Sequence, residues 1–274
     1  MTFIKQFINK AINSIFFNHK RPLYFAYLYD LSKRYVHFFQ GDENADMETN
    51  GEYRFLRKLF TITKLRTVFD VGSNEGEYSE IITKNDHRTK IFCFDPDRDA
   101  LETLQTKIGR SDNLNIVNSA VGDFDGESEF IFNNVSNKIN SFYDMKEIGY
   151  SEGSEKRKVS VLKLDTYCKQ NTISHIDLLK VDVEGHEEKV FVGATELLSA
   201  KKVDIIQFEY GYAAIYGNTF FRNLYNLFDK FGYDIYKIKP KSIIKLKYSP
   251  ELEHCAYGNF LAIRRDLEYI NRLI

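Results

Sequence analysis

The stretch from Val68 to Ser79, VFDVGSNEGEYS, constrains the fold of this chain more than any other. An apolar, β-branched run ends at Asp70, and two glycines follow before a charged segment that suits a helix. This pattern predicts a strand, a tight turn and a helix. Glycine in such a turn lets a ligand approach the backbone, and the free N–H groups of the new helix give that ligand a partly positive rim.

The spacing of the glycines excludes two common phosphate-binding motifs. The turn reads Asp70-x-Gly72-x-x-x-Gly76, which is neither the G-x-G-x-x-G of dinucleotide-binding folds nor a phosphate loop with its Lys-Ser or Lys-Thr pair. An ordinary surface turn would look the same over these few residues. Asp95 weakens that alternative because it ends the next apolar run, where nucleoside-binding α/β folds place an acidic residue that accepts hydrogen bonds from a ribose.

Helical and strand patterns alternate along most of the chain beyond residue 52. The later predicted strands cover 90–94, 115–121, 176–183, 203–208, 233–238 and 259–264, and the predicted helices cover 53–65, 75–84, 97–108, 187–198 and 219–231. This alternation predicts a doubly wound, mostly parallel α/β sheet. It lapses between residues 122 and 164, where the polar segment 133–157 carries scattered aromatic residues. That segment is either a surface insertion or a lid over a binding site.

A second group of polar residues follows the buried run 176–183. Asp182 ends this run, Glu184 and His186 come directly after it, and Glu209 ends the next predicted strand. Ligands of open α/β sheets bind at the carboxyl ends of the strands, so these residues should lie in the same crevice as the glycine turn. Alternatively, the two carboxylates cap the helix that begins near His186, which would explain one of them but not the cluster.

Four blocks of this sequence, in their order, resemble the FkbM-type S-adenosylmethionine-dependent methyltransferases. They are VFDVGSNEGEYS, IFCFDP, SAVGDFDG and LKLDTYCKQNTISHIDLLKVDVEGHEEKVFVGATELL, and the resemblance runs from about residue 52 to about residue 264. It implies a class I, Rossmann-like sheet of seven strands with an antiparallel last pair. It also implies transfer of the methyl group of S-adenosyl-L-methionine to a hydroxyl oxygen, here most simply on a sugar of a glycan or glycolipid precursor.

The same blocks indicate which residues would form the site. We expect the cofactor to be bound by Asp70, Gly72, Ser73, Asn74, Gly76, Asp95, Pro96, Ser119, Ala120 and Asp182. Methyl transfer to a hydroxyl needs a general base, for which the candidates are Asp182, Glu184, His186 and Glu209. At a helix N-terminus the helix dipole would disfavour the protonated form of His186. Its imidazole would then stay neutral near pH 7 and could accept a proton as the base. The carboxylates could instead hold a divalent cation that lowers the pKa of the acceptor hydroxyl, and the sequence does not decide between these mechanisms.

Composition narrows the range of partners. Lys and Arg (38) nearly balance Asp and Glu (39), so no basic footprint indicates a nucleic acid. The three cysteines are scattered without metal or disulfide spacing, as expected for free thiols in a reducing cytoplasm. Two other classes stay open: a catalytically inactive glycan-binding or assembly protein that keeps this fold, and a nicotinamide-dependent oxidoreductase, which should carry the missing glycine motif.

The N-terminal region differs from the rest. We assign residues 1–50 to a helical extension and residues 51–274 to the methyltransferase domain, with a polar hinge between them. Within residues 4–15, isoleucine, phenylalanine and alanine recur at helical spacing, and residues 1–21 contain no acidic side chain. Such a helix packs on the main domain or a partner subunit, as in a homo-oligomer, or lies on a membrane surface. We expect a cytoplasmic protein. If the helix lies on a membrane surface, it gives the protein peripheral contact with the inner face of the membrane.

Overall fold

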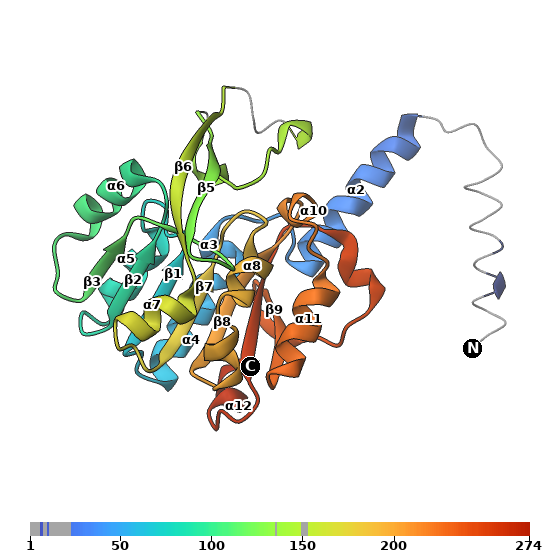
Figure 1. The fold of residues 1–274 in the computed structure, drawn as a ribbon. Helices are drawn as coiled ribbons and strands as arrows, with labels where there is room; N and C mark the ends of the chain where they lie inside the picture. The colour runs from blue at the N-terminus through green and yellow to red at the C-terminus, as the bar shows by residue number, and fades with distance from the viewer. Residues whose placement is uncertain (1–5, 8–9, 11–22, 135, 149–152) are drawn as a thin grey trace. The chain divides into compact units, whose positions relative to one another are not determined.

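The structure, a computed structural model, describes residues 6–7, 10, 23–134, 136–148 and 153–274 (Figure 1). The chain divides into two compact units, residues 1–42 and 43–274, and each is described here by itself. The amphipathic helix that the sequence predicts over residues 4–15 lies largely outside the described residues, so its packing and membrane interpretations stay predictions.

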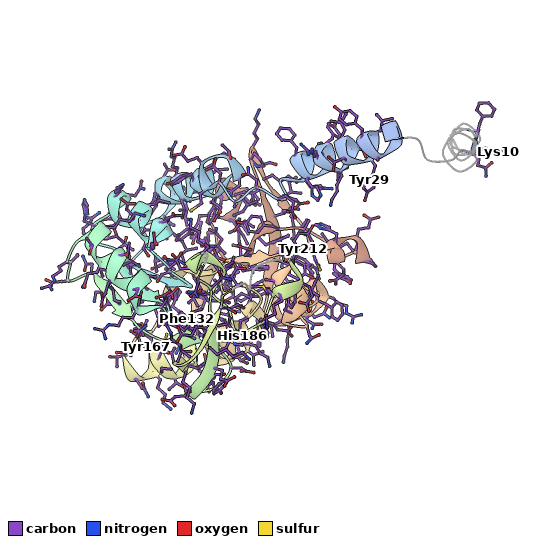
Figure 2. The ribbon with its side chains drawn as sticks, turned by 90° about the horizontal axis from the view of Figure 1, so that it is seen from above. Lys10, Tyr29, Phe132, Tyr167, His186 and Tyr212 are labelled. Carbon is purple, nitrogen blue, oxygen red and sulfur yellow. The ribbon has the colours of Figure 1, made fainter. Side chains whose placement is uncertain are left out.

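The described part of the first unit consists mainly of α2 (Leu23–Gln40), which is rich in aromatic residues. Tyr27, Tyr29 and Phe38 on this helix are exposed, and Figure 2 shows Tyr29 projecting from it. Arg34 and Asp30 form an ion pair of 3.1 Å across one helical turn. No helix among the described residues is both long and apolar enough to cross a membrane.

The second unit is built on an eight-stranded sheet with the order β10-β9-β11-β8-β7-β1-β2-β3. Its strands are β1 (Thr67–Val71), β2 (Lys90–Phe94), β3 (Leu114–Val117), β7 (Ile176–Val181), β8 (Val203–Tyr210), β9 (Tyr233–Lys239), β10 (Ser242–Lys245) and β11 (Gly258–Arg264). The pairs from β3 through β8 are parallel, whereas β11 runs antiparallel to both β8 and β9. The predicted doubly wound fold class and its antiparallel last pair are therefore confirmed.

One detail of the predicted sheet is corrected. The family resemblance implies seven strands, but β10 adds an eighth by pairing antiparallel with β9. Pro240 and Lys241 form the turn between these two strands, and Ser242 pairs with Lys239 on its far side. A two-residue turn of this kind makes a hairpin, which adds an edge strand without a crossover helix.

Helices cover both faces of the sheet. They are α3 (Met47–Asn50), α4 (Glu52–Ile62), α5 (Glu77–Asn85), α6 (Arg98–Ile108), α7 (Leu164–Gln170), α8 (Glu187–Val192), α9 (Thr195–Ser199), α10 (Ala213–Tyr216), α11 (Phe221–Lys230) and α12 (Ile270–Leu273). Successive residues of a strand point to opposite faces, so Leu178 on β7 packs in the layer with α4, α5 and α6, and Leu179 packs in the layer with α7, α8 and α11. Both leucines are fully buried, which fixes the register of the central strand.

A small second sheet with the order β4-β6-β5 projects beyond the main one (Figure 1). It consists of β4 (Ala120–Val121), β5 (Gly126–Phe132) and β6 (Glu155–Leu162). The single strand predicted for residues 115–121 is thus divided between two sheets. Asn118 marks the break, because its side-chain amide donates to the carbonyl oxygens of Asp95 and Pro96 at 3.1 and 3.0 Å.

Candidate functional site

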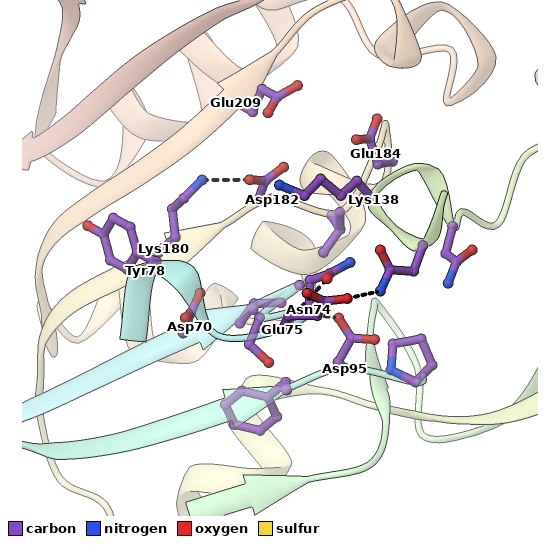
Figure 3. A pocket seen from close by; sticks show the side chains of 18 of the residues that line it. Asp70, Asn74, Glu75, Tyr78, Asp95, Lys138, Lys180, Asp182, Glu184 and Glu209 are labelled. Atoms are coloured by element: carbon purple, nitrogen blue, oxygen red, sulfur yellow. Dashed lines mark hydrogen bonds and ion pairs between the residues drawn. The ribbon is translucent and has the colours of Figure 1, made fainter. Parts of the chain in front are cut away.

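A cavity of about 270 Å³ lies at the carboxyl ends of the central parallel strands (Figure 3). Most of the residues that the sequence predicts for the site line it, namely Asp70, Gly72, Ser73, Asn74, Asp95, Pro96, Ser119, Ala120, Asp182, Glu184 and Glu209. Gly76 and His186 do not. Residues far apart in the sequence therefore meet at one edge of the sheet, as the topology requires.

Gly72 brings the first strand's turn against the end of β7. It has a φ of +78°, and a Cβ atom at this position would lie 1.7 Å from the carbonyl oxygen of Asp182. Its N–H and that of Ser73 both donate to the carbonyl oxygen of Phe94, at 2.9 and 3.1 Å. The turn is thus held between β2 and β7, and a larger residue at 72 would push the two halves of the cavity apart.

Gly76, which the sequence predicts as a cofactor-binding residue, is not among the residues that line the cavity. It is the N-cap residue of α5, has a φ of +76°, and a Cβ atom there would lie 2.5 Å from the Cγ of Leu104. This glycine therefore permits close packing of α5 on α6 and supports the cavity from behind.

Asp95 closes β2 with a buried carboxylate. Its two oxygens accept the backbone N–H groups of Asn74 and Asp97, at 2.9 and 2.8 Å. Burial raises the pKa of this carboxyl to about 7, although the two hydrogen bonds oppose the rise. Each carboxylate oxygen can accept a further bond, so Asp95 can still receive hydroxyl groups from a ligand.

Two more polar groups lie beside the glycine turn. Asp70 is buried and accepts the hydroxyl of Ser79 at 2.6 Å. Burial raises its pKa to about 6. The hydroxyl of Ser73 is also buried, lines the cavity and has no hydrogen-bond partner among the described residues. An unpaired buried hydroxyl is unfavourable in an empty site, and a polar ligand in the cavity could satisfy it.

Asp182, Glu184 and Glu209 form the predicted cluster on the other side of the cavity. One carboxylate oxygen from each lies within 4.8 Å of those of the other two. The ammonium of Lys180, two residues before Asp182 on β7, lies 2.8 Å from its Oδ2. Figure 3 shows this ion pair at the edge of the cavity.

The three carboxyl groups differ in their ionisation. Burial alone would raise the pKa of Asp182, but the Lys180 ammonium outweighs this effect and holds that pKa below its usual range. Burial and the neighbouring charge of Asp182 raise the pKa values of Glu184 and Glu209 well above the usual range. Near neutral pH the cluster therefore combines an ionised Asp182 with two carboxyl groups that tend to keep their protons.

Helix capping does not account for this cluster. The N-cap residue of α8 is His186, and Glu187 accepts the N–H groups of Val183 and Gly185, both at 3.2 Å. Burial raises the pKa of Glu187 to about 7. Asp182 and Glu184 are thus left to face the cavity.

His186 is buried away from the cavity. Its ring packs against Phe142, with ring centroids 4.2 Å apart, and its Nδ1 lies 2.9 Å from the hydroxyl of Tyr143. Burial lowers its pKa to about 4, so the ring is neutral as expected, but because of desolvation rather than the helix dipole. The base role that we predicted for His186 finds no support in this position.

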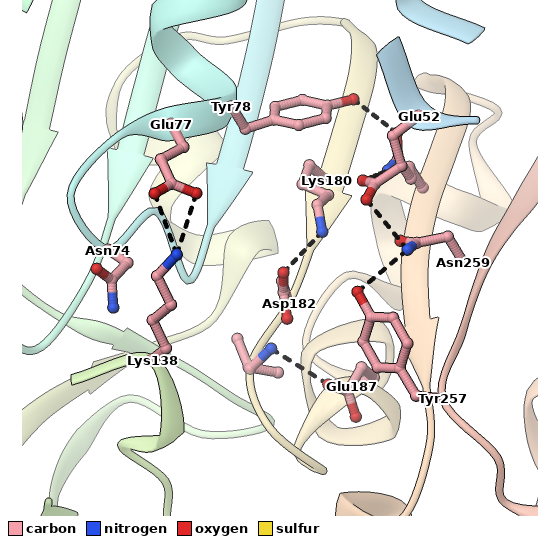
Figure 4. Close-up of polar contacts among 12 residues, drawn as sticks. Glu52, Asn74, Glu77, Tyr78, Lys138, Lys180, Asp182, Glu187, Tyr257 and Asn259 are labelled. Atoms are coloured by element: carbon pink, nitrogen blue, oxygen red, sulfur yellow. Dashed lines mark hydrogen bonds and ion pairs between the residues drawn. The ribbon is translucent and has the colours of Figure 1, made fainter. Parts of the chain in front are cut away.

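Residues 136–143, which we call the strap, cross the mouth of the cavity. The strap contacts the glycine turn, α6 and the acidic cluster through four hydrogen bonds of 2.8–3.1 Å: Asn137 to Glu75, Lys138 to Glu77, Asn140 to Asp97, and Ser141 to the carbonyl oxygen of Glu184. Figure 4 shows the contact of Lys138 with Glu77. These contacts favour the lid interpretation of the segment.

Several residues that line the cavity were not predicted from the sequence, among them Lys180, Glu52 and Tyr257. Lys180 has a recognisable signal, because it is a lysine inside an apolar strand and two residues from Asp182, hence on the same face. Glu52, at the start of α4, and Tyr257, before β11, also line the cavity. Neither carries a local signal, because each reaches the site only through the packing of the sheet.

Comparison with known proteins agrees with this geometry. Residues 70–235 match the Methyltransferase FkbM domain. The chain is 26% identical over 165 residues to the 2-O-methyltransferase NoeI of Sinorhizobium fredii, a match that covers 54% of this chain and 65% of that protein. It is also 26% identical over 170 residues to the hexuronic acid methyltransferase AglP of Haloferax volcanii, which covers 60% of this chain and 65% of that protein.

Among solved structures, a SAM-dependent O-methyltransferase from Thermotoga maritima shares 12% identity with this chain and gives a TM-score of 0.39. That match covers 79% of this chain and 66% of the other. The family match carries the assignment, because it covers more than half of the chain and includes both the glycine turn and the acidic cluster. This chain belongs to the FkbM methyltransferase family.

Proposed function

We propose that this protein transfers the methyl group of S-adenosyl-L-methionine to a hydroxyl oxygen of a carbohydrate. One observation carries the proposal: a single cavity joins the turn and the Asp95 carboxylate of the family domain to an acidic cluster built around Asp182. The name of one relative, a hexuronic acid methyltransferase, supports a sugar as the acceptor, and that of the other, a 2-O-methyltransferase, supports an oxygen as the methylated atom. The chain spans 65% of the length of each relative, so their activities reach it only as a proposal.

The residues on the β1 and β2 side fit the cofactor. Asp95 would accept hydrogen bonds from the ribose hydroxyls, the unpaired hydroxyl of Ser73 would bond to a polar group, and Gly72 holds the turn against the end of β7. Bound S-adenosyl-L-methionine would supply a methyl group on a positively charged sulfur, which is already a good leaving group. The protein must therefore align an acceptor oxygen and remove its proton.

Asp182 is the base that we propose. It faces the cavity, and the Lys180 ammonium keeps it ionised and able to take a proton. Glu184 and Glu209, with their raised pKa values, can donate hydrogen bonds and so help to hold the hydroxyl groups of the acceptor. A base placed in this way contributes about 10²–10⁴-fold to the rate.

A divalent cation is the second candidate at the same cluster. Three carboxylate donors within 4.8 Å are the ligands that Mg²⁺ and Ca²⁺ prefer. Lys180 competes with this arrangement because it already pairs with Asp182 at 2.8 Å. Treatment with EDTA distinguishes the two: a rate that survives chelation supports the base alone, and a rate restored by added Mg²⁺ supports the cation.

The decisive experiment separates cofactor binding from catalysis. Calorimetry should show binding of S-adenosylhomocysteine, and a panel of nucleotide sugars and oligosaccharides should reveal a methylated product by mass spectrometry. Asp182→Asn should then lower the methylation rate by about 10²–10⁴-fold while binding persists. Binding without methylation of any acceptor would support an inactive glycan-binding or assembly protein, and tighter binding of NAD would support the oxidoreductase.

We also propose that residues 1–50 form an extension to a catalytic domain of residues 51–274, in a cytoplasmic protein. The basic, amphipathic pattern of residues 4–15 supports weak attachment to the inner membrane face, where glycan precursors on lipid carriers would be near. Packing against a second copy is the alternative. Sedimentation with anionic liposomes, compared between the full chain and a variant that begins at Pro22, tests this, and equal sedimentation would contradict it.

A further inference from the structure

Lys180 is a buried charge beside the proposed base. It is 5% exposed, its ammonium lies 2.8 Å from Asp182, and the ring centroid of Tyr78 lies 5.7 Å from that ammonium. Burial disfavours a charged lysine, but the negative charges of Asp182, Glu52 and Glu209 outweigh this and raise its pKa. Lys180 is therefore a fixed cation among carboxylates at the floor of the cavity.

Glu52 is held on the opposite side of Lys180 by a network of amides (Figure 4). Its Oε1 accepts the side chains of Asn50 and Asn259 at 2.7 and 3.1 Å, and its Oε2 accepts that of Gln207. Gln207 in turn accepts the hydroxyl of Tyr78 at 2.7 Å. These partners are neutral, so they orient the Glu52 carboxylate without cancelling its charge.

The network joins parts of the chain inside and outside the family domain. Glu52 and Asn259 lie outside the matched residues 70–235, whereas Lys180 and Gln207 lie within them. A buried ion pair is a weak source of stability, because desolvation offsets much of its attraction and an apolar pair often does as well. The arrangement therefore suits a function that needs a carboxylate in a defined place.

We propose that Lys180 is a positioning residue for Asp182 and that Glu52 in turn fixes Lys180. The ammonium lies 2.8 Å from Oδ2 of Asp182 and so holds this carboxylate where it faces the cavity and the acceptor hydroxyl. The negative Glu52, the positive Lys180 and the negative Asp182 follow one another from the start of α4 to the proposed base. Glu52 lies outside the family domain, so a residue beyond that domain supports the base. This inference rests on the proposed function, in which Asp182 takes the proton.

The kinetic test compares Lys180→Met and Glu52→Gln with Lys237→Met. Lys237 is a matched control because it is equally buried, at 4% exposed, but lies on β9 with its ammonium 5.5 Å from the ring centroid of Phe260. Lys180→Met should lower kcat by about a hundredfold and Glu52→Gln by about tenfold, with KM for S-adenosyl-L-methionine nearly unchanged. Lys237→Met should leave both constants within about threefold. An equal loss in Lys237→Met would overturn the proposal.

A double variant tests whether Lys180 acts through Asp182. Residues that act as a unit are not additive, so Lys180→Met combined with Asp182→Asn should be no slower than Asp182→Asn alone. Effects that multiply would overturn the proposal. If Lys180→Met does not fold, Lys180→Gln in the same two backgrounds gives the same comparison.

A crystal structure of Lys180→Met with S-adenosylhomocysteine gives a readout that needs no acceptor. The Asp182 carboxylate should leave the place that it has in the wild-type complex, and an unmoved carboxylate would overturn the proposal. Failure of the wild-type protein to bind S-adenosylhomocysteine would instead contradict the proposed function, so the two failures are distinguishable.

Discussion

Gly72 and Asp182 are in direct backbone contact: a Cβ atom on Gly72 would lie 1.7 Å from the carbonyl oxygen of Asp182. The turn that would bind the cofactor and the strand end that would supply the base are thus built against each other. Because the reacting groups must be aligned closely, this contact fixes the distance between the two halves of the site.

We expect Gly72→Ala to abolish binding of S-adenosylhomocysteine and to lower stability. Gly109→Ala is a matched control, because Gly109 also has a positive φ, +86°, but nothing lies within 4 Å of its Cβ position. Gly109→Ala should lose only the free energy needed to hold a non-glycine residue at this backbone conformation, about 1–3 kcal/mol, whereas Gly72→Ala adds a clash with β7. Chemical denaturation and calorimetry measure both, and an equal loss in the two variants would show that the contact is not important.

Asp95→Ala should weaken binding of S-adenosylhomocysteine. The carboxylate is buried and its oxygens have free acceptor capacity, so its loss removes charge-assisted bonds of about 1.5–3 kcal/mol, or about ten- to a hundredfold in Kd. Glu127→Ala, an exposed carboxylate of β5 that does not line the cavity, is the control. Calorimetry decides, and unchanged affinity in Asp95→Ala would remove Asp95 from the site.

The cavity-lining residues that can be placed from the sequence are those with a local cause. Asp95 and Asp182 end apolar runs, Gly72 lies in a turn, and parallel strands bring their carboxyl ends together, so simple periodicity is enough to place them. Glu52 could not be found in this way. It reaches the site through a hydrogen bond to Gln207, 155 residues away in the sequence.

His186 shows why closeness in sequence can mislead. It follows Glu184 by two residues, and the sequence analysis therefore places both in one crevice. The backbone turns between them, because Glu184 has a φ of +50° and Gly185 a φ of +96°. This left-handed turn directs His186 towards Tyr143 and the strap, and no pattern of apolar residues reports such a turn.

The raised pKa of Asp95 predicts a dependence of stability on pH. Its folded-state pKa, about 7, lies above the ordinary value of 3.8, so the folded protein binds the proton more tightly than the unfolded chain does. The contribution of Asp95 to the free energy of unfolding is therefore complete below about pH 4 and is lost as the pH rises through 7. The total loss in the free energy of unfolding is on the order of 4 kcal/mol. Asp70, with a pKa of about 6, adds a loss of the same sign.

Urea denaturation between pH 4 and pH 8 measures this effect. The free energy of unfolding attributable to Asp95 should fall over that range, and Asp95→Asn should flatten the curve. Binding of S-adenosylhomocysteine should show the opposite trend, because the ionised carboxylate is the better acceptor for ribose hydroxyls. A variant with the same slope as the wild type would contradict the assignment.

The charges around the cavity predict which sugars it accepts. The ionisable acidic and basic side chains that line it are eight acids and two lysines: Glu52, Asp70, Glu75, Glu77, Asp95, Asp182, Glu184, Glu209, Lys138 and Lys180. Both lysines already pair with carboxylates, Lys138 with Glu77 and Lys180 with Asp182. Carboxylates match hydroxyl or amino groups that can donate, and they repel a second carboxylate by about 1–4 kcal/mol at contact distance.

We therefore expect a neutral glycoside to be methylated with a kcat/KM at least about tenfold higher than that of the matching uronic acid glycoside. Glu75→Gln should narrow this ratio because it removes a carboxylate from the cavity wall, and Glu127→Gln, with the same change on exposed β5, should leave it unchanged. Initial rates with the two glycosides at low and high salt measure the ratio. A preference for the uronic acid would mean that the acceptor's carboxylate avoids the cluster, and the acceptor would then have to enter from the strap side, beside Lys138.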